Sequence, residues 1–407
     1  MSGCEKKKCQ GRSLAKTAFI RDNQAGSMHF AYIQRDRWYI RLFLCVSFLI
    51  LICLPFISPF LYFSDRLENT ENRGLFLMPE LAFRTLEEFP GRFDQYYNDH
   101  FIFRNTLIRW NSVLKVRYLK TSPLPSKVII GKDNWLFYAD EGALDNYKCT
   151  SIFSIDDLQK IKRTVEKRGK WLKGHGIVYY LMPAPEKQTI YPEFMPDSIE
   201  RVRNASRLDQ VVEYIAKNSK VKVVDVRQDL YAKKREGPLF RKIDTHWNQY
   251  GAFIVSDSLL RVIAQDFPAI SPPAITDFSV TFETVRRGDL VDMLAITGDI
   301  LSERVPRLIP KDVKKAPDLA WVDLQNPFKI EEMVVKTMGN NTLPRMVMFR
   351  DSFATPLIPF ISAHFSRSVY VWSFSFDPDL ILREKPNVVI DELNERYLDR
   401  LIINDTL

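Results

Sequence analysis

The chain of 407 residues is poor in cysteine and histidine, with five of each. Cys4 and Cys9 lie near the start, Cys45 and Cys53 lie in an apolar run, and only Cys149 lies beyond residue 64. One cysteine cannot form an internal disulfide, so an exported domain would have to be held together by its core alone. Two cysteines without nearby histidine partners are also too few for a zinc site.

Acidic residues are scarce at the start of the chain. Residues 1–41 contain nine Lys/Arg and three Asp/Glu, so most of the net charge of +8 lies in this tail. Because the rest of the chain is close to neutral, nucleic-acid binding by the main domain is disfavoured. An apolar content of 46% with 13% aromatics argues against a disordered chain. The length suits one large α/β domain with additions, or two to three average domains.

Charged residues are absent from residues 42–64, "LFLCVSFLILICLPFISPFLYFS". A bilayer core of about 30 Å needs roughly 20 helical residues, so this run predicts a transmembrane signal-anchor helix. Pro55 and Pro59 are tolerated better in such helices than in soluble ones. A buried core helix is the alternative, and a cleaved signal peptide is disfavoured because no A-x-A-type site follows.

The basic tail predicts the orientation of this anchor. An excess of Lys/Arg before the span keeps the N-terminus in the cytoplasm, whether the chain starts at Met1 or Met28. We therefore expect a single-pass inner (cytoplasmic) membrane protein, with residues 1–41 as a cytoplasmic tail and everything after residue 64 periplasmic or otherwise extracytoplasmic.

The chain after residue 64 shows two different sequence patterns. Residues 65–120 have helical spacing of apolar residues and predict a helical connecting region. In residues 121–407, short apolar runs alternate with helical patterns. The runs are "KVIIG", "WLFY", "IVYYLMPAP", "VKVVDV", "RMVMF", "SVYVW" and "NVVID". This alternation predicts an α/β domain with a doubly wound parallel sheet flanked by helices.

Ligands of such sheets bind beyond the carboxyl ends of the strands. This rule selects "PAPEKQTIY" (residues 183–191), "DTHW" (residues 244–247) and "RDSFATP" (residues 350–356). In the last of these, Ser352 follows a strand and precedes a helix that Pro356 can begin. Backbone N–H groups at such a turn can stabilise an oxyanion, which makes Ser352 a candidate nucleophile. The alternative is a serine that only caps the helix.

Asp244 and His246 are two residues apart, and in an extended segment such residues project to the same side. Asp244 could then orient the imidazole while its other nitrogen takes a proton from Ser352, which completes the parts of an acyl-transfer triad. An ordinary turn is one alternative. A metal site is another, but it would need further ligands. Asp351 could supply one, whereas the other histidines lack partners, so we expect no metal.

Six segments resemble the alginate O-acetyltransferase-like proteins, which are SGNH-hydrolase-like enzymes of the bacterial cell envelope, and they occur in that family's order. They are "GKDNWLFY", "PAPEKQTIYPEFMP", "KIDTHWNQYGA", "RRGDLVDML", "FRDSFATPLIPFISAHFSRSVYVW" and "PNVVIDELNERYL". The resemblance covers roughly residues 70–400. It implies an SGNH-hydrolase-like catalytic domain within residues 121–407, with Ser352 as nucleophile, His246 as general base and Asp244 as its orienting acid. Arg350 departs from the general pattern, since it stands where a Gly-Asp-Ser motif has glycine.

The implied function is O-acetyl transfer to hydroxyls of an extracytoplasmic polysaccharide through an acetyl-serine, without a cofactor. In the family, a multi-pass membrane acyltransferase passes the acetyl group across the bilayer, so we expect such a partner. Trp247, Lys187, Tyr191 and Arg350 are candidate substrate-binding residues, although Trp247 could equally be core filler. Two alternatives stay open: an SGNH-type carbohydrate esterase that uses water as acceptor, and a non-catalytic glycan-binding assembly protein.

Overall fold

The computed structural model describes residues 38–50, 76–82, 86–100, 103–296, 300–311, 333–338 and 340–403, together with residues 53, 84 and 298. The chain forms two units, Met1–Asn105 and Thr106–Leu407. The predicted boundary at residue 121 therefore lies inside the second unit.

The first unit contains a helix over residues 38–50 and helix α2 (Phe89–His100). Most apolar side chains of residues 38–50 are exposed. In the described part of the chain, no helix combines the length and the apolar character needed to cross a membrane. Residues 51, 52 and 54–64 of the expected anchor lie outside the described residues, so the anchor stays a prediction.

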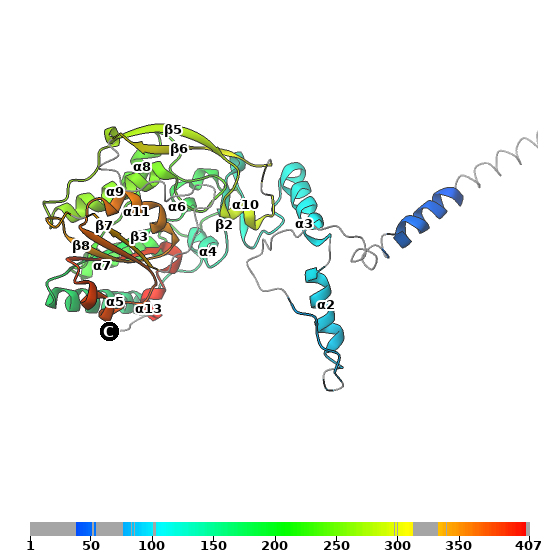
Figure 1. Ribbon diagram of the computed structural model, residues 1–407, viewed down its shortest axis with the longest axis horizontal. Coiled ribbons are helices and arrows are strands. Elements are labelled where there is room, and N and C mark those ends of the chain that lie inside the picture. The colour runs from blue at the N-terminus through cyan, green and yellow to red at the C-terminus, as the bar shows by residue number, and fades with distance from the viewer. Residues whose placement is uncertain are drawn as a thin grey trace, which may run out of the picture. The chain divides into compact units, whose positions relative to one another are not determined.

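The second unit is built on a six-stranded sheet (Figure 1). In spatial order its strands are β4 (Lys222–Val223), β3 (Val178–Ala184), β10 (Val388–Asn394), β8 (Arg345–Arg350), β9 (Arg367–Trp372) and β7 (Met333–Thr337). All neighbours are parallel except the edge strand β7, which is antiparallel to β9. The carboxyl ends of β3, β10 and β8 therefore meet at one edge of the sheet.

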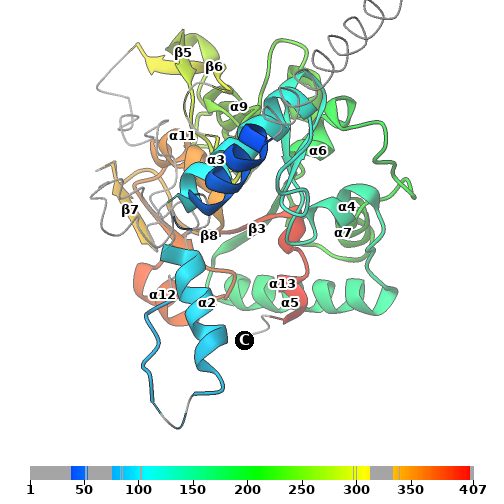
Figure 2. The ribbon, with the colours of Figure 1, turned by 90° about the vertical axis from the view of Figure 1, so that its right-hand side faces the viewer.

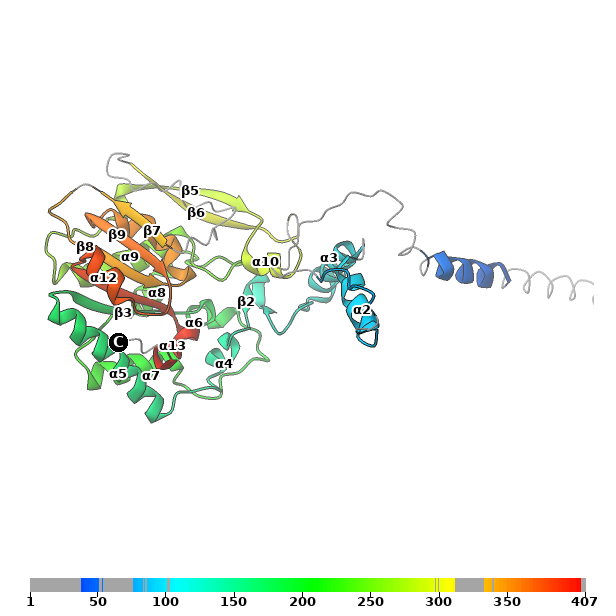
Figure 3. The same ribbon diagram turned by 60° about the horizontal axis from the view of Figure 1, so that its bottom comes forward.

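Helices cover both faces of the sheet (Figures 1 and 3). One face carries α5 (Ile155–Gly174), α7 (Arg207–Asn218), α12 (Pro378–Glu384) and α13 (Arg400–Ile403). The other carries α6 (Lys187–Ile190), α8 (Arg227–Lys233), α9 (Gln249–Ala264) and α11 (Ile358–Ser362). The predicted helix-flanked parallel sheet is confirmed.

Alternation along the strands explains the two layers. Tyr180 and Met182 of β3 are buried in one hydrophobic core, whereas Tyr179 and Leu181 are buried in the other. Strands whose side chains are apolar on both faces must be covered twice, which is typical of parallel sheets. Helix α5 begins where Ser154 and Asp157 form a reciprocal capping box.

Shorter elements complete the second unit. The hairpin β1 (Val128–Ile130) and β2 (Leu136–Tyr138) and the antiparallel ribbon β5 (Phe278–Val285) and β6 (Glu303–Pro310) lie outside the main sheet. The short helices are α3 (Arg104–Val113), its π-helical continuation η2 (Leu114–Leu119), α4 (Ala143–Lys148), α10 (Asp289–Met293), and the 3-10 turns η3 (Lys132–Asn134), η4 (Pro192–Phe194), η5 (Ile275–Asp277), η7 (Ser352–Leu357) and η8 (Glu395–Tyr397). Figure 2 shows α3, α4 and α6 from a second side.

Candidate active site

The residues from Asp244 to Trp247 form a tight loop just before α9. The Arg241 N–H donates to the His246 carbonyl at 3.0 Å, which closes the loop. The Asn248 side-chain oxygen then accepts two backbone N–H groups of α9, each at 3.0 Å, and caps the helix. The loop is a bend, so the extended conformation that we expected for Asp244 and His246 is wrong.

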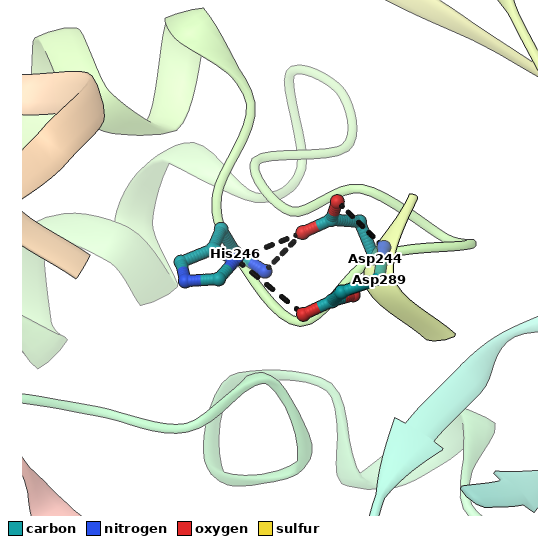
Figure 4. Close-up of side chains that lie close together, drawn as sticks. All are labelled: Asp244, His246 and Asp289. Carbon is teal, nitrogen blue, oxygen red and sulfur yellow. Dashed lines mark hydrogen bonds and ion pairs between the residues drawn. The ribbon is translucent and has the colours of Figure 1, made fainter. Parts of the chain in front are cut away.

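The bend brings Asp244 and His246 together by a different route. Oδ1 of Asp244 accepts the backbone N–H of His246 at 3.0 Å, the local hydrogen bond that an aspartate makes two residues on. The same oxygen lies 2.9 Å from Nδ1 of His246. The other ring nitrogen, Nε2, points away from the carboxylates (Figure 4). An ionised Asp244 thus holds the proton on Nδ1 and leaves Nε2 as the basic nitrogen.

Asp244 is fully buried and is nevertheless kept ionised. Burial alone would raise its pKa, but the positive charge of Arg241 and the hydrogen bonds from His246 outweigh that effect and lower the pKa below its usual value. Nη1 of Arg241 donates to Oδ2 of Asp244 at 3.1 Å, and the Asp289 N–H donates to the same oxygen at 3.2 Å. Both carboxylate oxygens are therefore satisfied by protein donors.

The guanidinium of Arg241 is itself held in place. Its Nε donates to Glu303 at 3.0 Å, and Nη2 donates to the Arg287 carbonyl. Gly288, which follows, allows the close approach: a Cβ there would lie 2.5 Å from the Ile243 carbonyl oxygen and 3.0 Å from the Asp244 Cβ. Sequence reasoning missed Arg241 and Glu303, because nothing in the local pattern joins residues 62 positions apart.

Asp289 is a second carboxylate at the same imidazole, and sequence reasoning missed it as well (Figure 4). Its Oδ2 lies 3.7 Å from Nδ1 of His246. Its oxygens accept the N–H of Thr245 at 2.8 Å and the Thr245 hydroxyl. Burial and the charge of Asp244 raise the pKa of Asp289. A possible signal was the segment "RRGDLVDML", which contains Asp289.

Asp244, His246 and Asp289 also offer one ligand atom each within 4.8 Å of one another, the spacing of a metal site. The surroundings favour an orienting network instead. The carboxylate oxygens already accept protein N–H and O–H groups, and the Arg241 guanidinium at 3.1 Å from Asp244 would repel a cation.

Ser352 begins the 3-10 turn η7 directly after β8. The cap of this turn is Asp351, whose Oδ1 accepts the Phe353 N–H at 2.8 Å, so Ser352 is not the capping residue. Ser352 is partly exposed, and its hydroxyl has no hydrogen-bond partner among the described residues. The next side chain, Phe353, packs against His246 with ring centroids 4.8 Å apart. The structure thus brings the Ser352 turn and the His246 loop into contact.

Asp351 ties this turn to the end of the neighbouring strand. Its Oδ2 accepts the Asn394 N–H at 2.6 Å, and its own N–H donates to Glu392 at 3.0 Å. Burial raises the pKa of both carboxyl groups, and the charge of Asp351 raises the pKa of Glu392 further. The turn that carries Ser352 is therefore fixed to the carboxyl end of β10.

The four predicted substrate-binding residues are all buried. Nζ of Lys187 donates to three backbone carbonyls around the His246 loop, and burial lowers the pKa of Lys187 to about 8. The Tyr191 hydroxyl accepts the Leu239 N–H at 2.8 Å. As placed, these two side chains support the loop, and their contact with substrate stays a prediction.

Trp247 and Arg350 are each 1% exposed. The Trp247 ring packs against Phe353 at 5.1 Å, and Arg350 donates to the Thr355 hydroxyl at 2.9 Å while lying over the Trp372 ring. A sugar could stack on Trp247 only after a rearrangement. Direct substrate contact by Arg350 also stays a prediction.

The remaining predicted segment, residues 183–191, supplies Glu186 to the same edge, and η8 supplies Glu395. Glu186 forms an ion pair with Arg396 at 2.6 Å, and its N–H donates to Glu395 at 2.8 Å. Burial raises the pKa of Glu395 to about 7, with a hydrogen bond from Thr189 acting against it and the charge of Glu186 adding to it. Glu395 thus changes charge close to neutral pH.

Replacing Glu395 with glutamine is expected to flatten the pH dependence of stability. A raised folded-state pKa contributes stability that is present below the ordinary value of 4.5 and is lost as pH rises through about 7. Between these pH values the native chain loses roughly 3 kcal/mol of its free energy of unfolding through this group. Glutamine does not ionise, so the variant should not show this loss. Thermal unfolding at pH 5 and pH 8 measures this. The exposed Glu200→Gln is the control, and parallel pH profiles for Glu395→Gln and the native chain would contradict the assignment.

A cavity of about 970 Å³ lies away from these residues. It lies at the amino ends of β3 and β4 and is lined by Lys170, Lys173, Lys217, Lys220 and Lys222 among others. Because ligands of parallel sheets bind at the carboxyl ends of the strands, the candidate site is the edge with His246 and Ser352 and not this cavity.

A known family matches part of this chain. Residues 128–317 match the family model described as "SGNH hydrolase-like domain, acetyltransferase AlgX". That range contains Asp244, His246 and Asp289 but not Ser352. The fold is the SGNH-hydrolase-like α/β fold, and the resemblance drawn from the motifs is confirmed.

Curated relatives and solved structures agree with the family model. A segment of 189 residues is 27% identical to the probable alginate O-acetylase AlgJ of Pseudomonas syringae pathovar tomato and covers 46% of each chain. Another of 198 residues is 28% identical to the probable alginate O-acetylase AlgJ of Pseudomonas aeruginosa, covering 47% of this chain and 48% of that one. This chain thus spans about half the length of the curated relatives that it matches. The structure of Bacillus cereus PatB1 with a sulfonyl adduct shares the fold, with a TM-score of 0.50 at 15% identity over 67% of this chain and 97% of PatB1.

Proposed function

We propose that this chain transfers acetyl groups to hydroxyls of an extracytoplasmic polysaccharide through an acetyl-serine at Ser352. His246 is the general base and Asp244 is the acid that orients it. The observation that carries the proposal is the fully buried, ionised Asp244 at 2.9 Å from His246 Nδ1, together with the packing of His246 against the residue that follows Ser352. The curated relatives, which are named as probable alginate O-acetylases, support the same chemistry.

In the first step, Ser352 Oγ attacks the carbonyl carbon of an acetyl ester. The serine proton passes to His246 Nε2, the Oγ–carbon bond forms, and the bond from carbonyl carbon to the donor oxygen breaks. The imidazolium returns the proton to that leaving oxygen. Asp244 stabilises the imidazolium in between, and it can do so because its pKa is low enough to keep it charged.

In the second step, a sugar hydroxyl attacks the acetyl-serine. His246 takes the hydroxyl proton, the new ester bond forms, and Ser352 leaves with a proton from the imidazolium. Water in place of the sugar would give acetate, so the same residues would serve an esterase. The acceptor alone separates these outcomes, and the active-site residues do not.

We also propose that residues 42–64 anchor the chain in the inner membrane, with the catalytic unit outside the cytoplasm. The charge-free run and the basic tail before it support this placement. An anchored domain would lie beside a multi-pass membrane acyltransferase, which we propose as the acetyl donor. Release of the chain from membranes by high salt without detergent would contradict the anchor.

Acceptor sugars are expected to raise turnover of an activated acetyl ester by the full-length chain and to become acetylated. The reason is that an acceptor that fits the site captures the acetyl-serine faster than water does. Ester turnover and mass spectrometry of the sugar measure the two results, with uronate and neutral oligosaccharides as acceptors. Ester cleavage without acetylation of any sugar would favour the esterase. Glycan binding without any ester turnover would favour the assembly protein.

A further inference from the structure

From Thr106 onward, the helix formed by α3 (Arg104–Val113) and η2 (Leu114–Leu119) packs against the rest of the second unit by one face only. Ser112 and Val116, four residues apart, are buried at 2% and 5% exposure. Val116 belongs to a hydrophobic cluster that also contains Ile243 and Leu290, and Val113 packs against this cluster. These two cluster members are the direct neighbours of Asp244 and Asp289. The inner face of the helix therefore shares a small core with the His246 loop.

The opposite face of this helix is apolar and open to solvent. Leu107, Trp110, Leu114 and Tyr118 are 56%, 73%, 54% and 69% exposed. Their spacing of three, four and four residues puts them on one side of a helix. We call these four residues the outer face. Single exposed apolar residues are ordinary, but a continuous stripe with a tryptophan and a tyrosine marks an interaction surface.

The charges beside the outer face are all positive. Between residues 104 and 120 the sequence has five Lys/Arg and no Asp/Glu. Lys115, Arg117 and Lys120 form no ion pair with another described residue, whereas Lys160 and Lys162 of α5, Lys217 of α7 and Lys233 of α8 pair with carboxylates. These three cations are thus available to anionic groups outside the chain.

We propose that the outer face lies in the membrane–water interface, with Leu107, Trp110, Leu114 and Tyr118 among the upper acyl chains and the flanking cations on anionic phospholipid headgroups. Tryptophan and tyrosine concentrate at this depth, and helices with an apolar face and a Lys/Arg-only polar face bind there. Cations near the surface add attraction to anionic lipids. A soluble protein partner would not need a surface free of acidic groups.

The position of the helix gives this contact a consequence for the site. Because the inner face packs with the neighbours of Asp244 and Asp289, lipid binding would hold the His246 loop close to the bilayer surface. An acetyl group delivered by a membrane partner would then have only a short distance to cover before it reaches Ser352. This consequence rests on the proposed function, but the membrane contact itself does not.

The contact is tested with the full chain in lipid nanodiscs of phosphatidylcholine and phosphatidylglycerol whose acyl chains are brominated, which quench nearby tryptophans. All variants carry Trp38→Phe, because Trp38 lies next to the predicted anchor. We expect quenching that is lost when Trp110→Phe is added. The matched control is Trp171→Phe on α5, a partly buried tryptophan that packs on His175 and Phe376, and it should leave the quenching unchanged.

A second arm tests the charges. Reversal of Lys115, Arg117 and Lys120 to glutamate, or nanodiscs of phosphatidylcholine alone, should reduce the quenching of Trp110. Turnover of a soluble acetyl ester by the charge-reversed chain should not change, since these residues lie outside the catalytic set. Turnover also reports the proposed function separately from the membrane contact.

Several outcomes would overturn the proposal. One is an anchored chain whose quenching does not depend on Trp110. Another is the finding that Trp110 is protected from aqueous iodide but is not quenched by brominated lipid. This result would show that a protein surface, and not lipid, covers the outer face. A chain that does not enter nanodiscs contradicts the anchor instead, and the same measurement on vesicles of the same composition then tests the outer face by itself.

Discussion

Ser352→Ala is expected to lower turnover of an activated acetyl ester by roughly 10⁴-fold or more. The substitution removes the oxygen that would carry the acetyl group, so transfer to sugar and hydrolysis should fall together. The fold should persist, because the turn is capped by Asp351 and fixed by Asn394, and the Ser352 hydroxyl bonds to no other described residue. Steady-state turnover and a thermal unfolding curve measure the two effects.

Ser373→Ala is the matched control for this prediction. Ser373 follows β9, the neighbouring parallel strand, is partly exposed like Ser352, and accepts the Ser375 N–H at 3.0 Å. Its removal should leave turnover within about twofold of the native chain, as for surface changes away from a site. If Ser352→Ala retained native turnover while remaining folded, the nucleophile would be elsewhere and glycan binding would become the leading alternative.

Much of the sheet could be predicted from the sequence. The runs "RMVMF", "SVYVW" and "NVVID" became β8, β9 and β10, because strands covered on both faces are apolar throughout and stand out from their surroundings. The ribbon β5–β6 and the edge strand β7 were not predicted. Their outward residues are exposed and mixed, as in β5, so they have no continuous apolar run to detect.

The site shows where local patterns stop being informative. The proximity of Asp244 to His246 was predictable because two residues of separation allow contact in several conformations, and the predicted conformation was nevertheless wrong. The joining of "DTHW" and "RDSFATP" followed from the rule that carboxyl strand ends share an edge. The partners Arg241–Glu303 and Thr245–Asp289 depend on how β6 and α10 fold back over the loop, which no periodicity encodes.

The predicted substrate-binding residues are buried for a reason that the sequence does not reveal. They are Trp247, Lys187, Tyr191 and Arg350. In the sequence, an aromatic or cationic residue beside a candidate catalytic residue suggests ligand contact. In the structure, the loop that carries His246 has little regular hydrogen bonding. Lys187 therefore donates to three carbonyls in and just before the loop, and the buried Trp247 ring packs beside it. A buried loop needs such partners for its backbone polar groups, and these residues supply them.

Asp244→Asn is expected to lower kcat by roughly 10³–10⁴-fold with little change in KM. Oδ2 of Asp244 accepts from Arg241 and from the Asp289 N–H, so the amide NH₂ of an asparagine cannot lie there without facing two donors. On the Oδ1 side it faces one donor, the His246 backbone N–H, so it takes that side and donates to Nδ1. The imidazole proton then moves to Nε2, which can no longer take a proton from Ser352.

The matched variant Asp289→Asn is expected to cost only about tenfold, although both carboxylates lie beside the same Nδ1. Asp289 is the more distant of the two carboxylates from Nδ1. Burial and the charge of Asp244 also raise its pKa, so Asp289 is less readily ionised than Asp244 and stabilises the imidazolium less. Its asparagine can keep both bonds to Thr245, because a hydroxyl can accept as well as donate. Equal losses of kcat for the two variants would show that the carboxylates orient His246 jointly. A larger loss for Asp289→Asn would exchange their roles, and Asp244 would then serve mainly to balance the buried charge of Arg241.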